Sequence, residues 1–140
     1  MNVIAVVNPK GGTSKTTTTA YLAHTLADSG RRVLVVDADG ENESLLRWSD
    51  LAGDKWRVDV IALPSASLHN RLPGLTRGRF DDIVIDTPPM DIAGGVITSA
   101  LHAATHVVIP CAPTTIDVDG SAQCTTCSRM SSPLETRAPS

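Results

Sequence analysis

The segment from Lys10 to Thr17 constrains the fold of this chain more than any other. It reads Lys-Gly-Gly-Thr-Ser-Lys-Thr-Thr, follows an apolar run at residues 3–7, and opens a stretch whose apolar residues recur at helical spacing. Glycines let the backbone curl so that successive N–H groups converge on one anion, and a helix N-terminus adds unpaired N–H groups and partial positive charge. A strand, a glycine turn and a helix in this order predict a phosphate-binding loop in an α/β fold.

The side chains of this loop match what a nucleotide and magnesium require. Lys15 is placed to reach the β- and γ-phosphates, the Thr16 hydroxyl to bind magnesium, and Thr17 to donate to the α-phosphate. The standard spacing G-x-x-x-x-G-K-[ST] is not met, because Pro9 and Ser14 stand at the two glycine positions. A glycine turn that only caps a helix, with Lys15 in solvent, is the alternative. The residues predicted to bind the nucleotide are Gly11, Gly12, Thr13, Ser14, Lys15, Thr16 and Thr17.

Two acidic motifs follow other apolar runs. Asp37-Ala38-Asp39 comes after residues 33–36, and Asp86 comes after residues 83–85 and precedes Thr87-Pro88-Pro89. Magnesium with a nucleotide needs a carboxylate near the loop threonine, often held through water, and the carboxyl end of a parallel strand can supply it. Each aspartate alone could simply cap the next helix or turn. Together with the loop, the combination predicts a magnesium-nucleotide site.

Strand and helix signals alternate along the chain, which predicts a mostly parallel sheet with helices on both faces. Strands are expected at residues 3–7, 33–36, 58–63, 83–85 and 106–109, and helices at 15–28, about 45–51, 67–72 and 92–104. From Gly120 the composition turns to Ser, Thr and Pro with no apolar period, which is typical of a disordered or aberrant tail. We therefore expect one domain at 1–119 and a tail at 120–140.

The loop and its acidic motifs resemble the ParA/MinD family of deviant phosphate-loop ATPases, and within it the ParA partition proteins. The resemblance covers residues 1–119 and is carried by NPKGGTSKTTTTAYLAHTLADSGRRVLVVDAD, IVIDTPP and VVIPCAPTTIDVD. It implies a P-loop NTPase fold with ATP and Mg²⁺ as ligands. By position, Lys10 matches the lysine that crosses a dimer interface to the partner's ATP, and Asp39 matches the aspartate that orients the attacking water. Asp37 matches an aspartate near the magnesium shell, and Asp86 matches the Walker B aspartate.

The resemblance therefore implies catalytic roles for Lys10, Lys15 and Asp39, and a metal site at Thr16, Asp37 and Asp86. It also implies an ATP-dependent homodimer that acts with a centromere-binding partner and non-specific DNA in plasmid or chromosome segregation. Two departures stand out. Gly40-Glu41-Asn42 replaces the frequent Pro-Gln-Gly, and the later strands and helices of the family have no counterpart, so we expect a C-terminally truncated chain.

Composition limits the remaining classes. Twelve basic against fifteen acidic residues give a net charge of −3, so charge does not support a strongly basic nucleic-acid binder. No apolar run is long enough to span a membrane and no secretory signal opens the chain, so we expect a cytoplasmic protein with no membrane partner. The three cysteines, Cys111, Cys124 and Cys127, are too few for a disulfide framework or a four-ligand zinc site.

Two other functions stay open at this point. One is a metabolic relative with the same loop, of the nitrogenase-reductase or dethiobiotin-synthetase kind. The other is a truncated chain that binds nucleotide or partners with little or no turnover, which the unusual tail favours.

Overall fold

The computed structural model describes residues 1–111, apart from the side chains of residues 91 and 92. The predicted tail, the predicted domain boundary at residue 119, and Cys124 and Cys127 lie outside the described residues. None of the helices in the described part is long and apolar enough to cross a membrane. The elements in chain order are β1 (Asn2–Val6), α1 (Lys15–Asp28), β2 (Val33–Asp37), α2 (Ser44–Ala52), the 3-10 helix η1 (Gly53–Lys55), β3 (Asp59–Ala62), α3 (Leu68–Thr76), β4 (Asp82–Asp86), α4 (Met90–Ala103) and β5 (His106–Val108).

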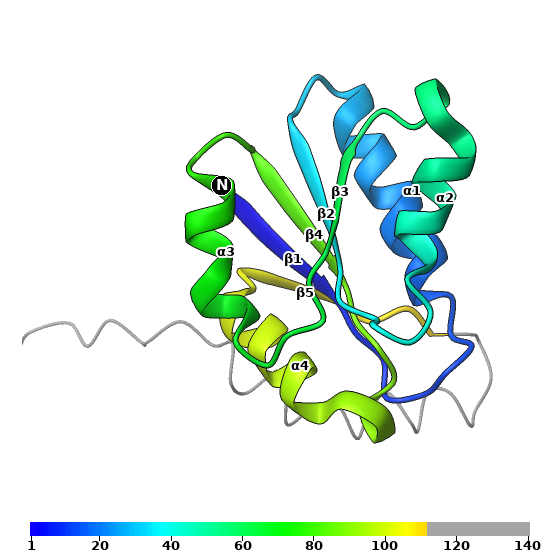
Figure 1. The fold of residues 1–140 in the computed structure, drawn as a ribbon, viewed down its shortest axis with the longest axis vertical. Coiled ribbons are helices and arrows are strands. Elements are labelled where there is room, and N and C mark those ends of the chain that lie inside the picture. Colours follow the sequence, from blue (N-terminus) through cyan, green and yellow to red (C-terminus); the bar gives the residue numbers. More distant parts are fainter. Residues whose placement is uncertain (112–140) are drawn as a thin grey trace, which may run out of the picture.

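The five strands form one sheet in the order β3-β2-β4-β1-β5, and every pairing between neighbours is parallel. Helices α1 and α2 cover one face of this sheet, and α3 and α4 cover the other (Figure 1). The predicted fold class, a mostly parallel sheet with helices on both faces, is confirmed. All parallel strands end at the same edge, so the segments that follow β1, β2 and β4 are brought together there.

Alternation along β2 shows how the apolar runs build two core layers. Val33 and Val35 pack with Ala23 of α1 and Leu45 of α2, whereas Leu34 and Val36 pack toward α3 and α4 on the opposite face. Successive side chains of a strand point to opposite faces, so a strand covered on both sides must be apolar at every position. This is why the continuous apolar runs in the sequence predict β2 and β4, two interior strands whose residues are all buried.

Helix α3 is longer than the sequence predicts. We expect it to end at residue 72, but it runs to Thr76 through Pro73. Leu68, Leu72 and Thr76 are all buried at intervals of four residues, so packing against α4 and the sheet sustains the helix past the proline. Helix α4 begins at Met90 rather than at 92, and its backbone departs from helical geometry at Ala93 (φ −145°, ψ 54°).

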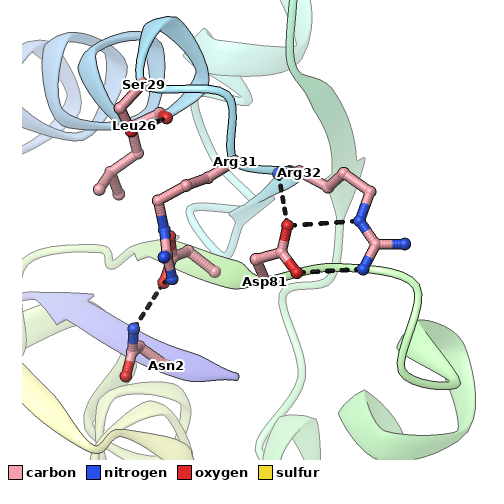
Figure 2. Close-up of polar contacts among 7 residues, drawn as sticks. Asn2, Leu26, Ser29, Arg31, Arg32 and Asp81 are labelled. Atoms are coloured by element: carbon pink, nitrogen blue, oxygen red, sulfur yellow. Dashed lines mark hydrogen bonds and ion pairs between the residues drawn. The ribbon is translucent and has the colours of Figure 1, made fainter.

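The amino end of the sheet is held by ion pairs that the sequence analysis does not predict. Arg31 pairs with Asp82, whose Oδ1 also accepts a hydrogen bond of 2.7 Å from Asn2 Nδ2. Arg32 donates to Asp81 through its backbone N–H (2.9 Å) and its guanidinium (3.0 Å), as Figure 2 shows. Hydrogen bonds from Arg31 and Arg32 lower the pKa of Asp82 and lower that of Asp81 to about 2. These pairs join the starts of β1, β2 and β4.

Candidate functional site

The three motifs singled out in the sequence meet at the carboxyl edge of the sheet. The loop of residues 7–14 leaves β1, Asp37 ends β2, and Asp86 ends β4. In the strand register Val6 and Asp37 are both partners of Asp86, so the two aspartates stand on neighbouring strands beside the start of the loop. The parallel topology thus gathers residues that lie far apart in the sequence, such as Thr16 and Asp86, which are 70 positions apart.

The loop adopts the curled backbone that its glycines predict. Gly12 has a φ of +71°, and no atom lies within 4 Å of where a Cβ would stand, so the space beside the backbone is open. Ser14 also has a positive φ, +61°, which is uncommon for a residue with a side chain. Ser14 occupies the position where the standard motif has its second glycine, and this left-handed conformation is the physical reason for that glycine.

Lys15 is buried within the loop, 7% exposed, and its Nζ donates to the carbonyl oxygen of Lys10 at 2.9 Å. The Thr13 hydroxyl donates to the same oxygen at 3.2 Å. The Lys10 N–H in turn donates to Asn8 Oδ1 (2.9 Å), and Asn8 Nδ2 donates to the carbonyl of Pro110 after β5 (2.7 Å). The loop is therefore ordered around its own lysine, which does not fit the alternative of a solvated Lys15.

Thr16 and Asp86 are in direct contact. The Thr16 hydroxyl donates to Asp86 Oδ2 at 2.7 Å, and the Thr19 hydroxyl lies 3.4 Å from Oδ1. Burial raises the pKa of Asp86 to about 7, although the bond from Thr16 acts in the opposite direction. A hydroxyl and a carboxylate are the hard oxygen donors that Mg²⁺ prefers, so these residues fit that ion.

The Asp37 carboxylate accepts hydrogen bonds from three backbone N–H groups. Its Oδ2 accepts from Leu45 (3.0 Å) and Leu46 (3.3 Å) in the first turn of α2, and its Oδ1 accepts from Asp39 (3.2 Å). Burial raises the pKa of Asp37, and these hydrogen bonds counter the shift. The residue before α2, Glu43, makes no capping bond with its side chain. Asp37 therefore caps α2 from the end of the preceding strand, β2, which is the alternative role that the sequence left open for it. Its place in the magnesium shell stays a prediction.

The carboxylate of Asp39 is held by residues that follow it. Oδ2 accepts from Asn42 Nδ2 at 2.9 Å, and Oδ1 accepts from the N–H of Glu41 at 3.2 Å. A Cβ at Gly40 would stand 2.8 Å from Pro64 Cβ. This close approach accounts for the glycine found here in place of the proline that is frequent in the resembling family.

The loop from Gly11 to Thr17 and Asp39 line one cavity of about 360 Å³, whereas Lys10, Asp37 and Asp86 are not among its lining residues. Sequence reasoning assigned no site role to five of the lining residues: Asn42, Ser44, Trp48, Thr87 and Pro89. Thr87 and Pro89 lie in the segment directly after Asp86 in the sequence. The sequence carries only weak signals for the other three. Asn42 is an amide three residues after Asp39, and Ser44 and Trp48 are four residues apart and so lie on one face of α2. A second hollow of about 370 Å³ lies along the loop beside Thr18, Pro110 and Cys111. The first cavity is lined by Gly11, Gly12, Thr13, Ser14, Lys15, Thr16, Thr17, Asp39, Asn42, Ser44, Trp48, Thr87 and Pro89.

Comparisons with known proteins agree with this geometry. A family model described as an AAA domain matches residues 1–49. The maintenance of carboxysome distribution protein A of Gloeobacter kilaueensis is 34% identical over 116 residues, which cover 83% of this chain and 51% of that protein. Protein ParA of Rhizobium radiobacter is 29% identical over 123 residues, covering 88% of this chain and 54% of the relative. The chain thus spans about half the length of these curated relatives.

Among solved structures, cobyrinic acid a,c-diamide synthase from Mycobacterium smegmatis with bound ADP and magnesium superposes with a TM-score of 0.74. It is 28% identical in sequence, and the match covers 93% of this chain and 67% of that one. The same fold therefore holds a nucleotide and magnesium in a protein of similar sequence.

Proposed function

Because this chain belongs to the ParA/MinD family of P-loop ATPases, we propose that it binds ATP with Mg²⁺ and hydrolyses it in a partition-type cycle. The observation that carries the proposal is the convergence of Lys15, Thr16, Asp39 and Asp86 at one edge of the sheet, three of them lining a single cavity and the fourth bonded to Thr16.

In the proposed complex the backbone N–H groups from Gly11 to Ser14 bind the phosphates, and Thr17 donates to the α-phosphate. The Lys15 ammonium, which donates to the Lys10 carbonyl in the free protein, would exchange that oxygen for phosphate oxygens. Thr16 and, through water, Asp86 hold the magnesium ion, which supplies positive charge against the phosphates. A bound cation would favour the ionised form of Asp86, because a nearby positive charge stabilises a carboxylate.

For hydrolysis we assign to Asp39 the orientation of the attacking water, with Asn42 holding the carboxylate in place. Lys15, together with Lys10 from the second copy of a dimer, offsets the charge that develops on the transferring phosphoryl group. Most of the rate then comes from positioning and electrostatics rather than from proton transfer.

The partners are proposed on the family resemblance. They are a second copy in an ATP-dependent homodimer, a centromere-binding protein and non-specific DNA, with plasmid or chromosome segregation in the cytoplasm as the outcome. A net charge of −3 gives DNA binding no general electrostatic support, so any DNA contact must use a local basic surface.

The test is steady-state phosphate release by the 140-residue chain, with and without DNA, beside nucleotide binding by calorimetry. Asp39→Ala should retain ATP and lose hydrolysis. Lys10→Ala should retain nucleotide and lose the ATP-dependent dimer, measured by light scattering. Asp50→Ala, at an exposed position of α2, is the matched control and should behave as wild type. Native turnover in Asp39→Ala would remove that residue from the mechanism.

Two alternatives give different results in the same assay. A chain with little or no turnover binds ATP without releasing phosphate, whether or not DNA is added. The similar diamide synthase is named as a metabolic enzyme. If this chain is a metabolic enzyme too, it should hydrolyse ATP only when a small-molecule acceptor is present, and DNA should not change the rate.

A further inference from the structure

We propose that Trp48 is a wall of the nucleotide site and covers the phosphate end of bound ATP. The inference rests on the proposed function and extends it to a residue that neither the sequence motifs nor the family resemblance assigns.

The position of Trp48 is the first argument. Its side chain lines the same cavity as Thr16, Thr17 and Asp39, and it is 40% exposed. The loop from Gly11 to Thr17 and Asp39 line other parts of this cavity, so the indole borders the region where the γ-phosphate and magnesium are proposed to lie. A large aromatic side chain left this exposed gains most from a ligand that removes it from water.

The anchoring of α2 is the second argument. Leu45 is fully buried on the sheet side of α2, while Ser44 and Trp48, one helical turn apart, both line the cavity. The Asp37 carboxylate binds the N–H groups of Leu45 and Leu46, so the first turn of α2 is tied to the end of β2. The indole is thus carried on a helix that is fixed to the same sheet edge as the phosphate loop.

The chemistry of the indole is the third argument. An apolar ring over the phosphate end excludes water, and a lower local dielectric strengthens the attraction between Lys15 and the phosphates. Its N–H is a donor that a phosphate oxygen or an ordered water can accept. Trp48 would therefore favour the triphosphate over the diphosphate, since the extra phosphate is the part nearest to it.

The chain contains a built-in control, because its other tryptophan lies away from this cavity. Trp56 packs against the core beneath α1 and edge-on to the ring of His24, with ring centroids 4.7 Å apart. Its Nε1 is buried. Nucleotide should therefore change the emission of Trp48 and leave that of Trp56 unaltered.

The experiment is a fluorescence titration of the wild-type chain, Trp48→Phe and Trp56→Phe with Mg²⁺ and a non-hydrolysable ATP analogue, at a concentration where light scattering shows monomers. Wild type and Trp56→Phe should change emission, acrylamide quenching should fall about twofold, and Trp48→Phe should show neither effect. Trp48→Ala should raise the Kd for the ATP analogue about two- to tenfold and change that for ADP less. If Trp56→Phe does not fold, wild type against Trp48→Phe decides alone.

Three outcomes would overturn the inference. Calorimetric binding with unchanged Trp48 emission removes Trp48 from the site and leaves the proposed function standing. An emission change that appears only when dimers form means that a second copy covers Trp48, not the nucleotide. No binding in calorimetry overturns the inference and the proposed function together.

Discussion

Asp82 and Asp86 begin and end the same strand, β4, and both are 1% exposed, yet their surroundings are opposite. Asp82 meets the Arg31 guanidinium and the Asn2 amide, which lower its pKa. Asp86 meets two threonine hydroxyls, and burial raises its pKa to about 7; the neighbouring Asp37 carboxylate adds to this shift and the Lys15 ammonium opposes it. One strand thus carries a carboxylate whose negative charge is stabilised at its amino end, and a carboxylate whose negative charge is disfavoured by burial at its carboxyl end.

The difference separates stability from function. A buried carboxylate with an arginine partner holds the strands together, and nothing is gained by adding a ligand there. A buried carboxylate without such a partner is unfavourable in the free protein, and a cation relieves it. Perturbed groups of this kind gather at functional sites, which is the pattern seen at the carboxyl edge.

The largest expected effects come from replacing one cationic side chain at each end of the sheet, Lys15 or Arg31, by alanine. Lys15→Ala should weaken Mg·ATP binding at least about a hundredfold, because it leaves buried phosphate charge without its partner. Arg31→Ala should leave nucleotide affinity unchanged and lower the melting temperature instead. Calorimetry and thermal melting of both variants measure the two effects.

Two results would contradict this prediction. Native affinity in Lys15→Ala would mean that the loop does not bind phosphate through this lysine. A loss of affinity in Arg31→Ala equal to that in Lys15→Ala would mean that the two ends of the sheet are not separate.

A smaller effect is expected at the residue that holds Asp39. Asn42→Ala frees one carboxylate oxygen, so kcat for ATP hydrolysis should fall about tenfold while KM stays near the native value. Asn70→Ala, at an exposed position of α3, is the matched control and should have no effect. If kcat and KM both stay native in Asn42→Ala, this hydrogen bond does not position Asp39.

The residues at the carboxyl edge of the sheet are easier to predict from the sequence than those at the amino edge. The phosphate loop and the aspartates at the ends of β2 and β4 follow from local patterns, because a parallel sheet places the carboxyl ends of its strands at one edge. The pairing of Arg31 with Asp82 depends on the register between β2 and β4, and the capping of α2 by Asp37 depends on where residues 38–43 place the start of that helix. Arg31 and Asp82 are 51 residues apart, and no local spacing signals their pairing. The sequence left the capping role of Asp37 open as one of two alternatives and could not choose between them.

Packing explains the remaining differences. Pro73 predicts the end of a helix, but buried Leu72 and Thr76 continue it, since tertiary contacts override local propensity. Trp48 reads in the sequence as one more apolar residue of a short helix. Only the orientation of α2, set by Leu45 on its other side, places the indole in the cavity.

The smallest predicted effect is a pair of opposite pH dependences. At the carboxyl end the folded pKa of Asp86, about 7, lies above its ordinary value of 3.8, so between these values the folded protein binds a proton that the unfolded chain does not. Its contribution to stability is therefore full below about pH 4 and is lost as the pH rises to about 7. At the amino end the pKa of Asp82 is lowered and that of Asp81 is about 2, so their contribution is present above about pH 4 and is lost as the pH falls toward 2.

Melting temperatures across this range should separate the two ends by a few degrees in each variant. Asp86→Asn should flatten the slope between about pH 4 and pH 7 and leave the acid limb intact, whereas Asp82→Asn should weaken the acid limb only. Bound Mg·ATP favours the ionised Asp86, so the stabilisation that it gives the wild type should be larger above about pH 7 than below it, and Asp86→Asn should lose this difference. Equal slopes in wild type and Asp86→Asn would mean that Asp86 is ionised in the free protein, and the contrast between the two ends of β4 would then fail.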